Sequence, residues 1–127
     1  MPPQRPEDIH RLWMQAYNAG DLDSLAALYE PQARLVPRPG QEPVAGPEAV
    51  RKVLQGFLEQ KGRLEIDIQT VSAIQAGDVA LLRSRWRLRG PGRDARPVEI
   101  AHSSSEIARR QPDRSWRYLI DHPFGAD

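Results

Sequence analysis

The apolar pattern of this chain changes its period once, and that change limits the folds open to it. Up to residue 61, apolar residues recur every three or four positions, the spacing of helices with one buried face. After Gly62 they alternate with polar residues at every second position, as half-buried strands require. Helices followed by long consecutive strands indicate an α+β domain rather than a doubly wound α/β domain.

The helical part begins with two helices separated by a short break. The first is predicted over residues 6–19, because Gly20 suits the left-handed conformation that ends a helix. Asp21 is a good N-cap for the second. The apolar face of this second helix continues to Tyr29, and Pro31 is expected to stop it.

A short strand and a loop precede the third helix. Residues 33–36 predict a strand, and the prolines of residues 37–43 predict an extended loop that cannot join a ladder. Such loops often rim a site. Residues 46–48, Gly-Pro-Glu, favour a helix start, with proline in the first turn and glutamate near the positive end of the dipole.

Four long strands are expected after Gly62. They begin near Leu64, after the turn at residues 77–78, near Pro97 and near Ser115. In the second of these, arginines occupy every other position from 83 to 89, and we expect this face of the strand to be exposed to solvent. Glu65 and Asp67 would oppose the arginines if the first two strands form a hairpin, so the stripe is interpreted as solubilising.

The third long strand suggests an irregularity. Val98, Ile100 and His102 share one face whereas Ile107 lies on the other, which predicts a β-bulge within residues 103–105. Such a bulge would help to curve the sheet around a cavity. The alternative is that Ile107 faces a partner subunit.

Composition excludes several classes of protein. The 127 residues are enough for a single domain, assigned here to residues 1–127. Lysine plus arginine (18) nearly balances aspartate plus glutamate (17), so neither nucleic acid nor an anionic membrane is an expected partner. There is no cysteine, and the three histidines lack metal-site spacing. No segment approaches the ~20 apolar residues of a membrane span. We expect a cytoplasmic protein without metal or cofactor.

Several segments together are typical of one known family: Trp13 to Asp21 (WMQAYNAGD), Leu28 with Tyr29, Ala33, Gly46, and Trp116 to Pro123 (WRYLIDHP). They resemble the nuclear transport factor 2-like superfamily, and within it the SnoaL-like proteins of unassigned function. The resemblance implies a cystatin-like α+β cone, in which three N-terminal helices pack on a curved antiparallel or mixed sheet that encloses a pocket. It also implies a homodimer through the convex sheet face, where Tyr118 or Ile120 could serve as bulky contacts.

Relatives in this superfamily include ketosteroid isomerase, scytalone dehydratase and polyketide cyclases, as well as proteins that only bind or dimerise. The resemblance places the two oxyanion donors of steroid isomerisation at Trp13 and near Ser103, and the base near Pro37, so all three groups are replaced in this sequence. Steroid isomerisation in its known form is therefore not expected. Fold alone does not decide function.

Three residues are candidate acid–base groups. The resemblance places Asp121 where some cyclases carry an aspartate, and burial in an apolar cavity would raise its pKa. If Trp116 and Tyr118 line the cone, Asp121 points away and His122 points inward. His102 lies on the apolar side of its strand. Each of these residues could instead be a hydrogen-bonded structural group without a catalytic role.

The expected pocket wall combines aromatic and aliphatic side chains with two hydroxyls: Trp13, Tyr17, Val53, Phe57, Leu82, Ser84, Trp86, Ser103 and Leu119.

Three functions fit these expectations. The first is a pocket protein that binds a small apolar or aromatic molecule. The second is a cofactor-free isomerase, dehydratase or cyclase using Asp121 or His102. The third is a dimerisation or interaction module without a ligand. A cavity above ~300 Å³ with a carboxylate or imidazole in its wall would favour the first two.

Overall fold

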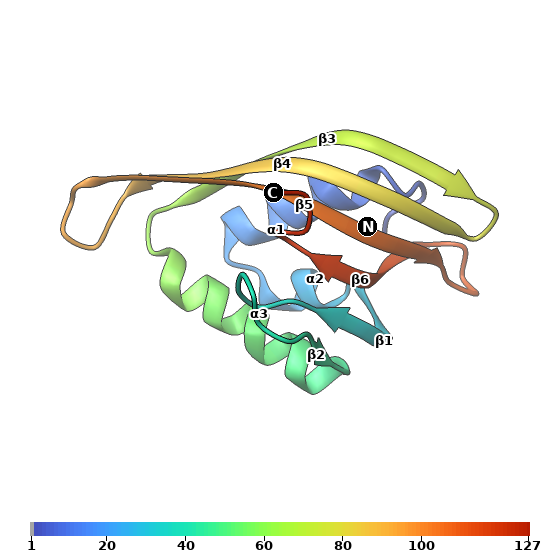
Figure 1. Ribbon diagram of the computed structural model, residues 1–127. Helices are drawn as coiled ribbons and strands as arrows, with labels where there is room; N and C mark the ends of the chain where they lie inside the picture. Colours follow the sequence, from blue (N-terminus) through green and yellow to red (C-terminus); the bar gives the residue numbers. More distant parts are fainter. Residues whose placement is uncertain (1) are drawn as a thin grey trace.

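The computed structural model describes residues 2–127 and shows three helices and one mixed sheet (Figure 1). The helices are α1 (Asp8–Ala19), α2 (Leu22–Ala26) and α3 (Pro47–Lys61). The strands are β1 (Tyr29–Leu35), β2 (Val44–Ala45), β3 (Glu65–Ala76), β4 (Val79–Pro91), β5 (Pro97–Arg110) and β6 (Trp116–His122). The strand order in the sheet is β2-β1-β6-β5-β4-β3. All neighbouring strands are antiparallel except the parallel pair β1 and β6.

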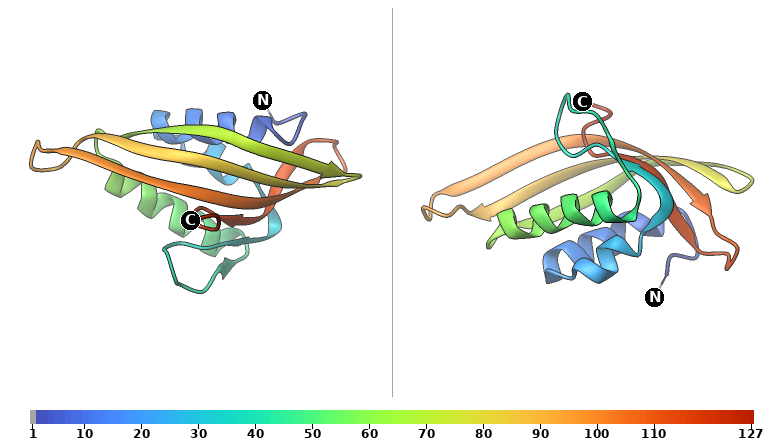
Figure 2. Two further views of the ribbon diagram at one scale, coloured as in Figure 1. Left: turned by 45° about the horizontal axis from the view of Figure 1, so that its top comes forward. Right: turned by 90° about the horizontal axis from the view of Figure 1, so that it is seen from below.

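The helices all lie on the concave side of the curved sheet, as two further views show (Figure 2). The helix α1 lies along β3, whereas α3 lies near β1 and β2 at the other margin. The predicted arrangement, an α+β domain with N-terminal helices on a curved sheet, is confirmed.

The helix boundaries follow local chemistry. Gly20 adopts a left-handed conformation with φ of 69°, which ends α1. The side chain of Asp21 accepts a hydrogen bond from the Ser24 backbone N–H at 3.1 Å and so caps α2. Pro47 occupies the first turn of α3, where its missing N–H costs nothing.

The prediction for the end of the second helix is wrong. The helix α2 stops at Ala26, and Tyr29 and Pro31 belong to β1. Pro31 is tolerated there because the pairing of β1 with β6 is interrupted between Tyr29 and Arg34, so no ladder hydrogen bond needs its nitrogen. Tertiary pairing with β6 therefore overrides the helical pattern of this segment.

The arginine face of β4 is exposed, as its alternation predicts. Asp67 lies opposite Arg87, and Glu65 lies opposite Arg89, in the β3–β4 ladder. The ion pair that Arg87 forms is with Glu99 of β5, at 3.3 Å. Acidic residues therefore flank the arginines on both neighbouring strands.

The β-bulge predicted within residues 103–105 is wrong, because the β4–β5 ladder runs without a break through these residues. The irregularity lies on the other side of β5. Ile107 pairs with Ile120 and Ala108 pairs with Tyr118, so Leu119 is an additional residue in β6. Another register shift in the sheet falls at Val71, between Thr70 and Ser72 of β3.

The extra residue in β6 decides which side chains face the helices. Without it, Tyr118 and Asp121 would point to opposite faces. With Leu119 inserted, Tyr118 and Asp121 are both buried on the concave side, at 2% and 5% exposure. His122 pairs with Ser105 on the convex side. Two expectations are therefore wrong. His122 points away from the helices, and Tyr118 is a core residue instead of a contact on the convex face.

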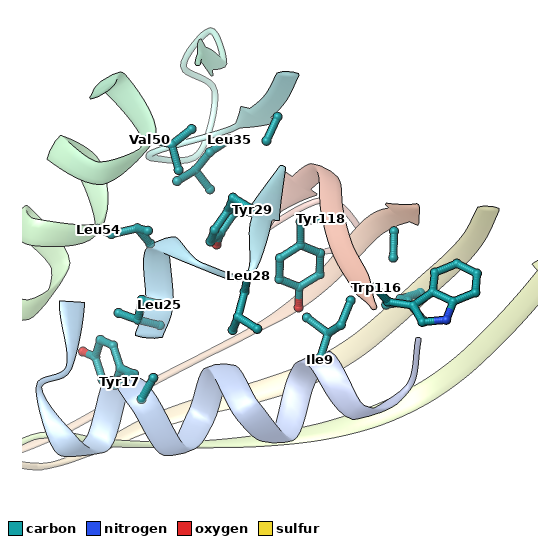
Figure 3. Packing of buried hydrophobic residues seen from close by; sticks show 14 of the residues in the cluster. Ile9, Tyr17, Leu25, Leu28, Tyr29, Leu35, Val50, Leu54, Trp116 and Tyr118 are labelled. Carbon is teal, nitrogen blue, oxygen red and sulfur yellow. The ribbon is translucent and has the colours of Figure 1, made fainter. Parts of the chain in front are cut away.

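The hydrophobic core fills the space between the helices, β1 and β6 (Figure 3). Leu25, Leu35, Leu54 and Trp116 are among its most completely buried members. Leu82 is also fully buried in this core.

The convex face carries a row of aliphatic residues that crosses four strands. Ile74, Leu81, Ile107 and Ile120 are successive register partners from β3 to β6. Ile74 is 62% exposed, and Leu81 and Ile120 are exposed as well. Within residues 2–127, no helix is long and apolar enough to cross a membrane.

Candidate functional site

A cavity of about 260 Å³ lies between the concave face of the sheet and the helices α1 and α3. Its volume is a little below the ~300 Å³ typical of the smallest ligand pockets. Most of its wall is aromatic or aliphatic, and the polar groups are few. The wall comprises His10, Trp13, Tyr17, Phe57, Gln60, Lys61, Leu64, Ile66, Ile68, Ser84, Trp86, Leu88, Ile100, Ser104, Glu106, Tyr118, Asp121, Pro123 and Phe124.

The cavity has a buried end and an exposed rim. Gln60 and Ile100 are exposed, so the cavity opens to solvent beside the end of α3. Ser84, Ser104, Glu106 and Asp121 are each at most 5% exposed. The polar groups of the sheet are therefore concentrated at the buried end.

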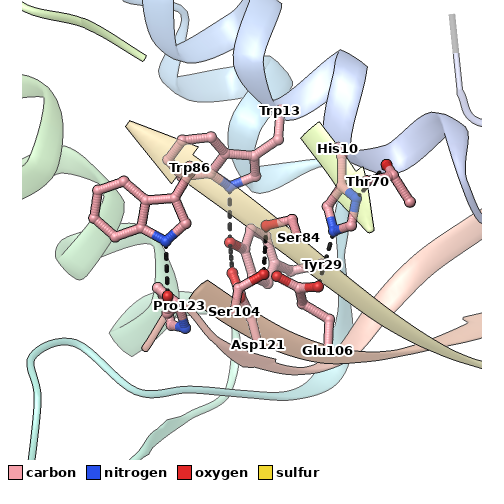
Figure 4. Close-up of polar contacts among 10 residues, drawn as sticks. All are labelled: His10, Trp13, Tyr29, Thr70, Ser84, Trp86, Ser104, Glu106, Asp121 and Pro123. Atoms are coloured by element: carbon pink, nitrogen blue, oxygen red, sulfur yellow. Dashed lines mark hydrogen bonds and ion pairs between the residues drawn. The ribbon is translucent and has the colours of Figure 1, made fainter. Parts of the chain in front are cut away.

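A chain of hydrogen bonds leads from α1 to Asp121 (Figure 4). The indole N–H of Trp13 donates to the Tyr29 hydroxyl at 2.9 Å. The Tyr29 hydroxyl donates to Oδ2 of Asp121 at 2.5 Å. Because Tyr29 comes from β1 and Asp121 from β6, the parallel pairing of these strands brings the two groups together.

The pKa of Asp121 is raised from 3.8 to about 8, mainly by burial and in addition by the negative charge of Glu106, against the lowering effect of the hydrogen bond from Tyr29. A carboxyl group with a pKa near neutrality can both donate and accept a proton. Burial likewise raises the pKa of Tyr29 well above 10, so its hydroxyl stays protonated and remains a donor.

Glu106 and His10 form a second polar cluster at the same end. Glu106 is the register partner of Asp121 in the β5–β6 ladder. Its Oε1 lies 2.8 Å from Nε2 of His10, and Nδ1 of His10 lies 2.7 Å from the Thr70 hydroxyl. Burying a carboxylate is costly without a partner, and His10 supplies one.

Two serine hydroxyls complete the polar end. Ser84 of β4 and Ser104 of β5 are register partners, and their Oγ atoms lie 2.5 Å apart. One of the two hydroxyls donates to the other, so both have a hydrogen-bond partner at the buried end of the cavity.

The structure brings six of the residues named from the sequence into the cavity wall: Trp13, Tyr17, Phe57, Ser84, Trp86 and Asp121. Trp13 and Tyr17 stack with ring centroids 5.2 Å apart. The Trp86 indole donates to the Pro123 carbonyl at 2.7 Å.

Four residues expected in the wall lie elsewhere. Leu82 is part of the core, and Val53 packs against it from α3. Ser103 pairs with Arg85 and so faces the convex side, because the predicted bulge is absent. Leu119 is the bulged residue of β6 and lines a shallow surface groove with Ile120.

His102 and His122 also lie outside the cavity wall. His102 faces the concave side, where its ring lies 5.1 Å from Trp86 and 5.0 Å from Phe124, and its Nδ1 bonds the carboxylate of Asp127. This bond lowers the pKa of Asp127. His122 lies at the end of β6, on the convex side. The structure therefore does not bring either histidine into contact with Asp121.

Sequence reasoning missed Tyr29, Glu106 and His10. Tyr29 was assigned to a helix, and the bulge wrongly expected at residues 103–105 turned Glu106 outward. An unbroken period of two from Ile100 would have placed Glu106 in the wall. His10 precedes Trp13 by three positions and Tyr17 by seven, so helical spacing alone places it on their face.

The fold is that of the nuclear transport factor 2-like superfamily. A superfamily protein from Salmonella enterica serovar Typhimurium superposes with a TM-score of 0.78 at 12% identity, covering 94% of this chain and 88% of the other. A ketosteroid isomerase-like protein from Erwinia carotovora gives 0.77 at 18% identity, covering 91% and 88%. A protein from Thiobacillus denitrificans, named provisionally as a calcium/calmodulin-dependent protein kinase type II association domain, gives 0.77 at 22% identity, covering 96% and 94%.

The family model of the SnoaL-like domain matches residues 10–113. The chain therefore belongs to the SnoaL-like domain family, and the resemblance inferred from its sequence is confirmed. No curated protein matches the chain. Identities of this size to solved structures establish a shared fold and leave the ligand open.

We predict that Asp121→Asn removes a pH dependence of stability. The pKa of Asp121 rises from 3.8 to about 8 on folding, so between these values the folded state binds more protons and stability falls as pH rises. The amide does not titrate and still accepts the bond from Tyr29. In urea denaturation, the free energy of unfolding of the variant relative to that of the wild type should increase between pH 4 and 8 by at least ~1.4 kcal/mol, the equivalent of one pKa unit. A constant difference across this range would contradict the raised pKa.

Proposed function

We propose that the protein binds a small, uncharged apolar or aromatic molecule in this cavity. The observation that carries the proposal is the separation within the wall: aromatic and aliphatic side chains line most of the cavity, and hydrogen-bonding groups gather at its buried end. Small-molecule sites commonly combine an apolar wall with a few placed polar groups. The cavity is small but opens at its rim, so a ligand can extend beyond the enclosed volume.

The charges of the wall support an uncharged ligand. Among the wall residues, the one lysine or arginine is Lys61, whose ammonium already donates to the Leu64 carbonyl at 2.8 Å and lies 5.4 Å from the Tyr17 ring centroid. The Glu106 carboxylate at the buried end would repel a carboxylate or phosphate, and Asp121 offers no positive charge. An anionic group therefore has no ready partner in the cavity.

We expect the protein to bind 2-naphthol, a flat apolar probe with one hydroxyl group, with quenching of tryptophan fluorescence. Phe57→Ala should weaken binding by about tenfold, because the phenyl ring loses apolar contact worth ~1.5 kcal/mol or more. Leu58→Ala is the matched control: Leu58 is the next residue of α3, packs against the core and lies outside the cavity wall.

Binding is measured by fluorescence titration and calorimetry, alongside native mass spectrometry of the purified protein for a retained small molecule. Absence of probe binding together with an empty mass spectrum would overturn the proposal. Equal losses in the two variants would place the probe outside the cavity.

A second candidate function is catalysis with Asp121 as the acid–base group of an isomerase, dehydratase or cyclase reaction without a cofactor. The observation that favours it is the buried carboxyl in the cavity wall, held by Tyr29 at 2.5 Å and with a pKa of about 8. A base must lie within hydrogen-bonding reach of the proton that it removes, and a ligand in this cavity would meet Asp121.

For a substrate with an acidic C–H beside a carbonyl group, turnover should rise with pH through about 8, because Asp121 must be ionised to act as the base. Asp121→Asn should lower kcat by at least about a hundredfold, the usual contribution of a general base. Turnover that survives unchanged in this variant would remove Asp121 from the mechanism.

The aliphatic row on the convex face supports a homodimer as the assembly in which the cavity functions. Four aliphatic residues in register across neighbouring strands offer an apolar surface to a second copy. Leu81→Asp should convert the dimer to a monomer in sedimentation measurements, whereas Gln69→Asp, an exposed residue of the β3 edge strand away from the row, should not. A wild-type monomer at micromolar concentration would contradict this assembly.

A further inference from the structure

The ligand binding proposed above uses the negative charge of Glu106 but gives no role to His10, although the ion pair of these two residues occupies the buried end of the cavity. His10 is 2% exposed and Glu106 is 4% exposed. Replacing such a pair by apolar residues is often neutral or stabilising, so stability alone is a weak reason for it. The residues that the pair contacts are more informative about its role: Glu106 lies beside Asp121, and His10 bonds Thr70 at the edge of the sheet.

The inner connection leads to Asp121. Glu106 and Asp121 lie directly opposite each other in the β5–β6 ladder, and both line the cavity. Residues paired in this way have Cβ atoms about 4.5–5.5 Å apart, which lets two carboxyl groups meet directly or through one water. The effect of the Glu106 charge on Asp121 agrees with this closeness.

The outer connection leads to solvent. The ring of His10 bonds Glu106 through Nε2 and the Thr70 hydroxyl through Nδ1, at 2.8 and 2.7 Å (Figure 4). Thr70 is exposed, and β3 forms the free edge of the sheet. The register shift at Val71, immediately after Thr70, interrupts the β3–β4 ladder at this point. The two nitrogens of one buried imidazole thus join the cavity side to the outer side.

We propose that Glu106, His10 and Thr70 form a proton path between Asp121 and solvent that does not pass through the mouth of the cavity. The inference rests on the acid–base role of Asp121 in the second candidate function. An apolar ligand that fills the cavity excludes water from Asp121, so a proton taken from the ligand needs another exit before the next cycle.

Each step of the path moves one proton. In the ion pair, His10 carries protons on both nitrogens, and Nε2 donates to the Glu106 carboxylate. The N–H bond at Nδ1 breaks as its proton moves to the Thr70 hydroxyl, which releases its own proton to water and leaves a neutral ring with its proton on Nε2. The O–H bond of protonated Asp121 then breaks as the other oxygen of Glu106 takes the proton, directly or through one water. Asp121 is left ionised, one proton has reached solvent, and the reverse sequence returns it.

The other groups around Asp121 do not offer this route. The Tyr29 hydroxyl bonds Asp121 and is followed by the Trp13 indole, which has a proton to donate but no acceptor. Burial raises the pKa of Tyr118 far above 10, so this residue stays protonated. His10 is therefore the group next to this pair of carboxyls whose second ring nitrogen connects them to a hydroxyl at the surface.

The outer half of the path is tested with Thr70→Val and Thr70→Ser. Thr70 is exposed, so both variants should fold. NMR of protein labelled with ¹⁵N-histidine measures exchange with water of the proton on Nδ1 of His10, without any ligand. Valine keeps the shape but removes the hydroxyl, and should slow exchange about tenfold, as a barrier higher by about 1.4 kcal/mol would. Serine should restore the wild-type rate. Equal rates in all three proteins would overturn the proposal.

The inner half is tested by the pKa of Asp121, measured by ¹³C NMR in the wild type and in Glu106→Gln. Glutamine still bonds His10 but has no charge, so the pKa of Asp121 should fall. An unchanged pKa would show that the two carboxyls do not communicate and would overturn the path. Both measurements are independent of a ligand, so failure of the path and failure of the proposed ligand binding are distinguishable. If Glu106→Gln does not fold, the Thr70 variants decide alone.

Discussion

The single extra residue in β6, Leu119, is the constraint on which the site depends. A strand of unbroken period two can point either Tyr118 or Asp121 at the helices, but not both. The bulge turns both inward, so one strand contributes an aromatic ring to the core and a carboxyl to the cavity. It also sets Asp121 directly opposite Glu106. The polar end of the cavity is a consequence of this local irregularity.

The polar end is stable because every group in it is partnered. Among the described residues, each buried side-chain nitrogen or oxygen has a hydrogen-bond partner. The partners come from α1, β1, β3, β4, β5 and β6, and two of the three sets of bonds join the first helix to the sheet. A buried carboxyl held in this way can keep a raised pKa without disrupting the fold. The same network defines the orientation of Asp121 toward the cavity.

The site was only partly predictable from the sequence, for identifiable reasons. Trp13, Tyr17 and Phe57 were found because helical spacing places them on faces that the sheet covers. Tyr29 was missed because an isolated helical pattern does not reveal that β6 will pair with this segment. Glu106 was missed because Ile107 was taken as a sign of a slip in β5, whereas Ile107 belongs to an aliphatic row on the convex face. Alternation identifies two faces of a strand but does not say which one is covered.

The sequence by itself determined the class of fold and the order of its elements, because the change of period at Gly62, the caps at Gly20 and Asp21 and the proline at position 47 act through local geometry. It also determined that one face of β4 is exposed to solvent, since four alternating arginines cannot all be buried. Tertiary structure decided the register of β6, the position of Tyr29 in a strand instead of a helix, and the placement of His10, Glu106 and Asp121 in one cavity wall. These depend on contacts between residues as many as 96 positions apart, and such contacts leave no local pattern in the chain.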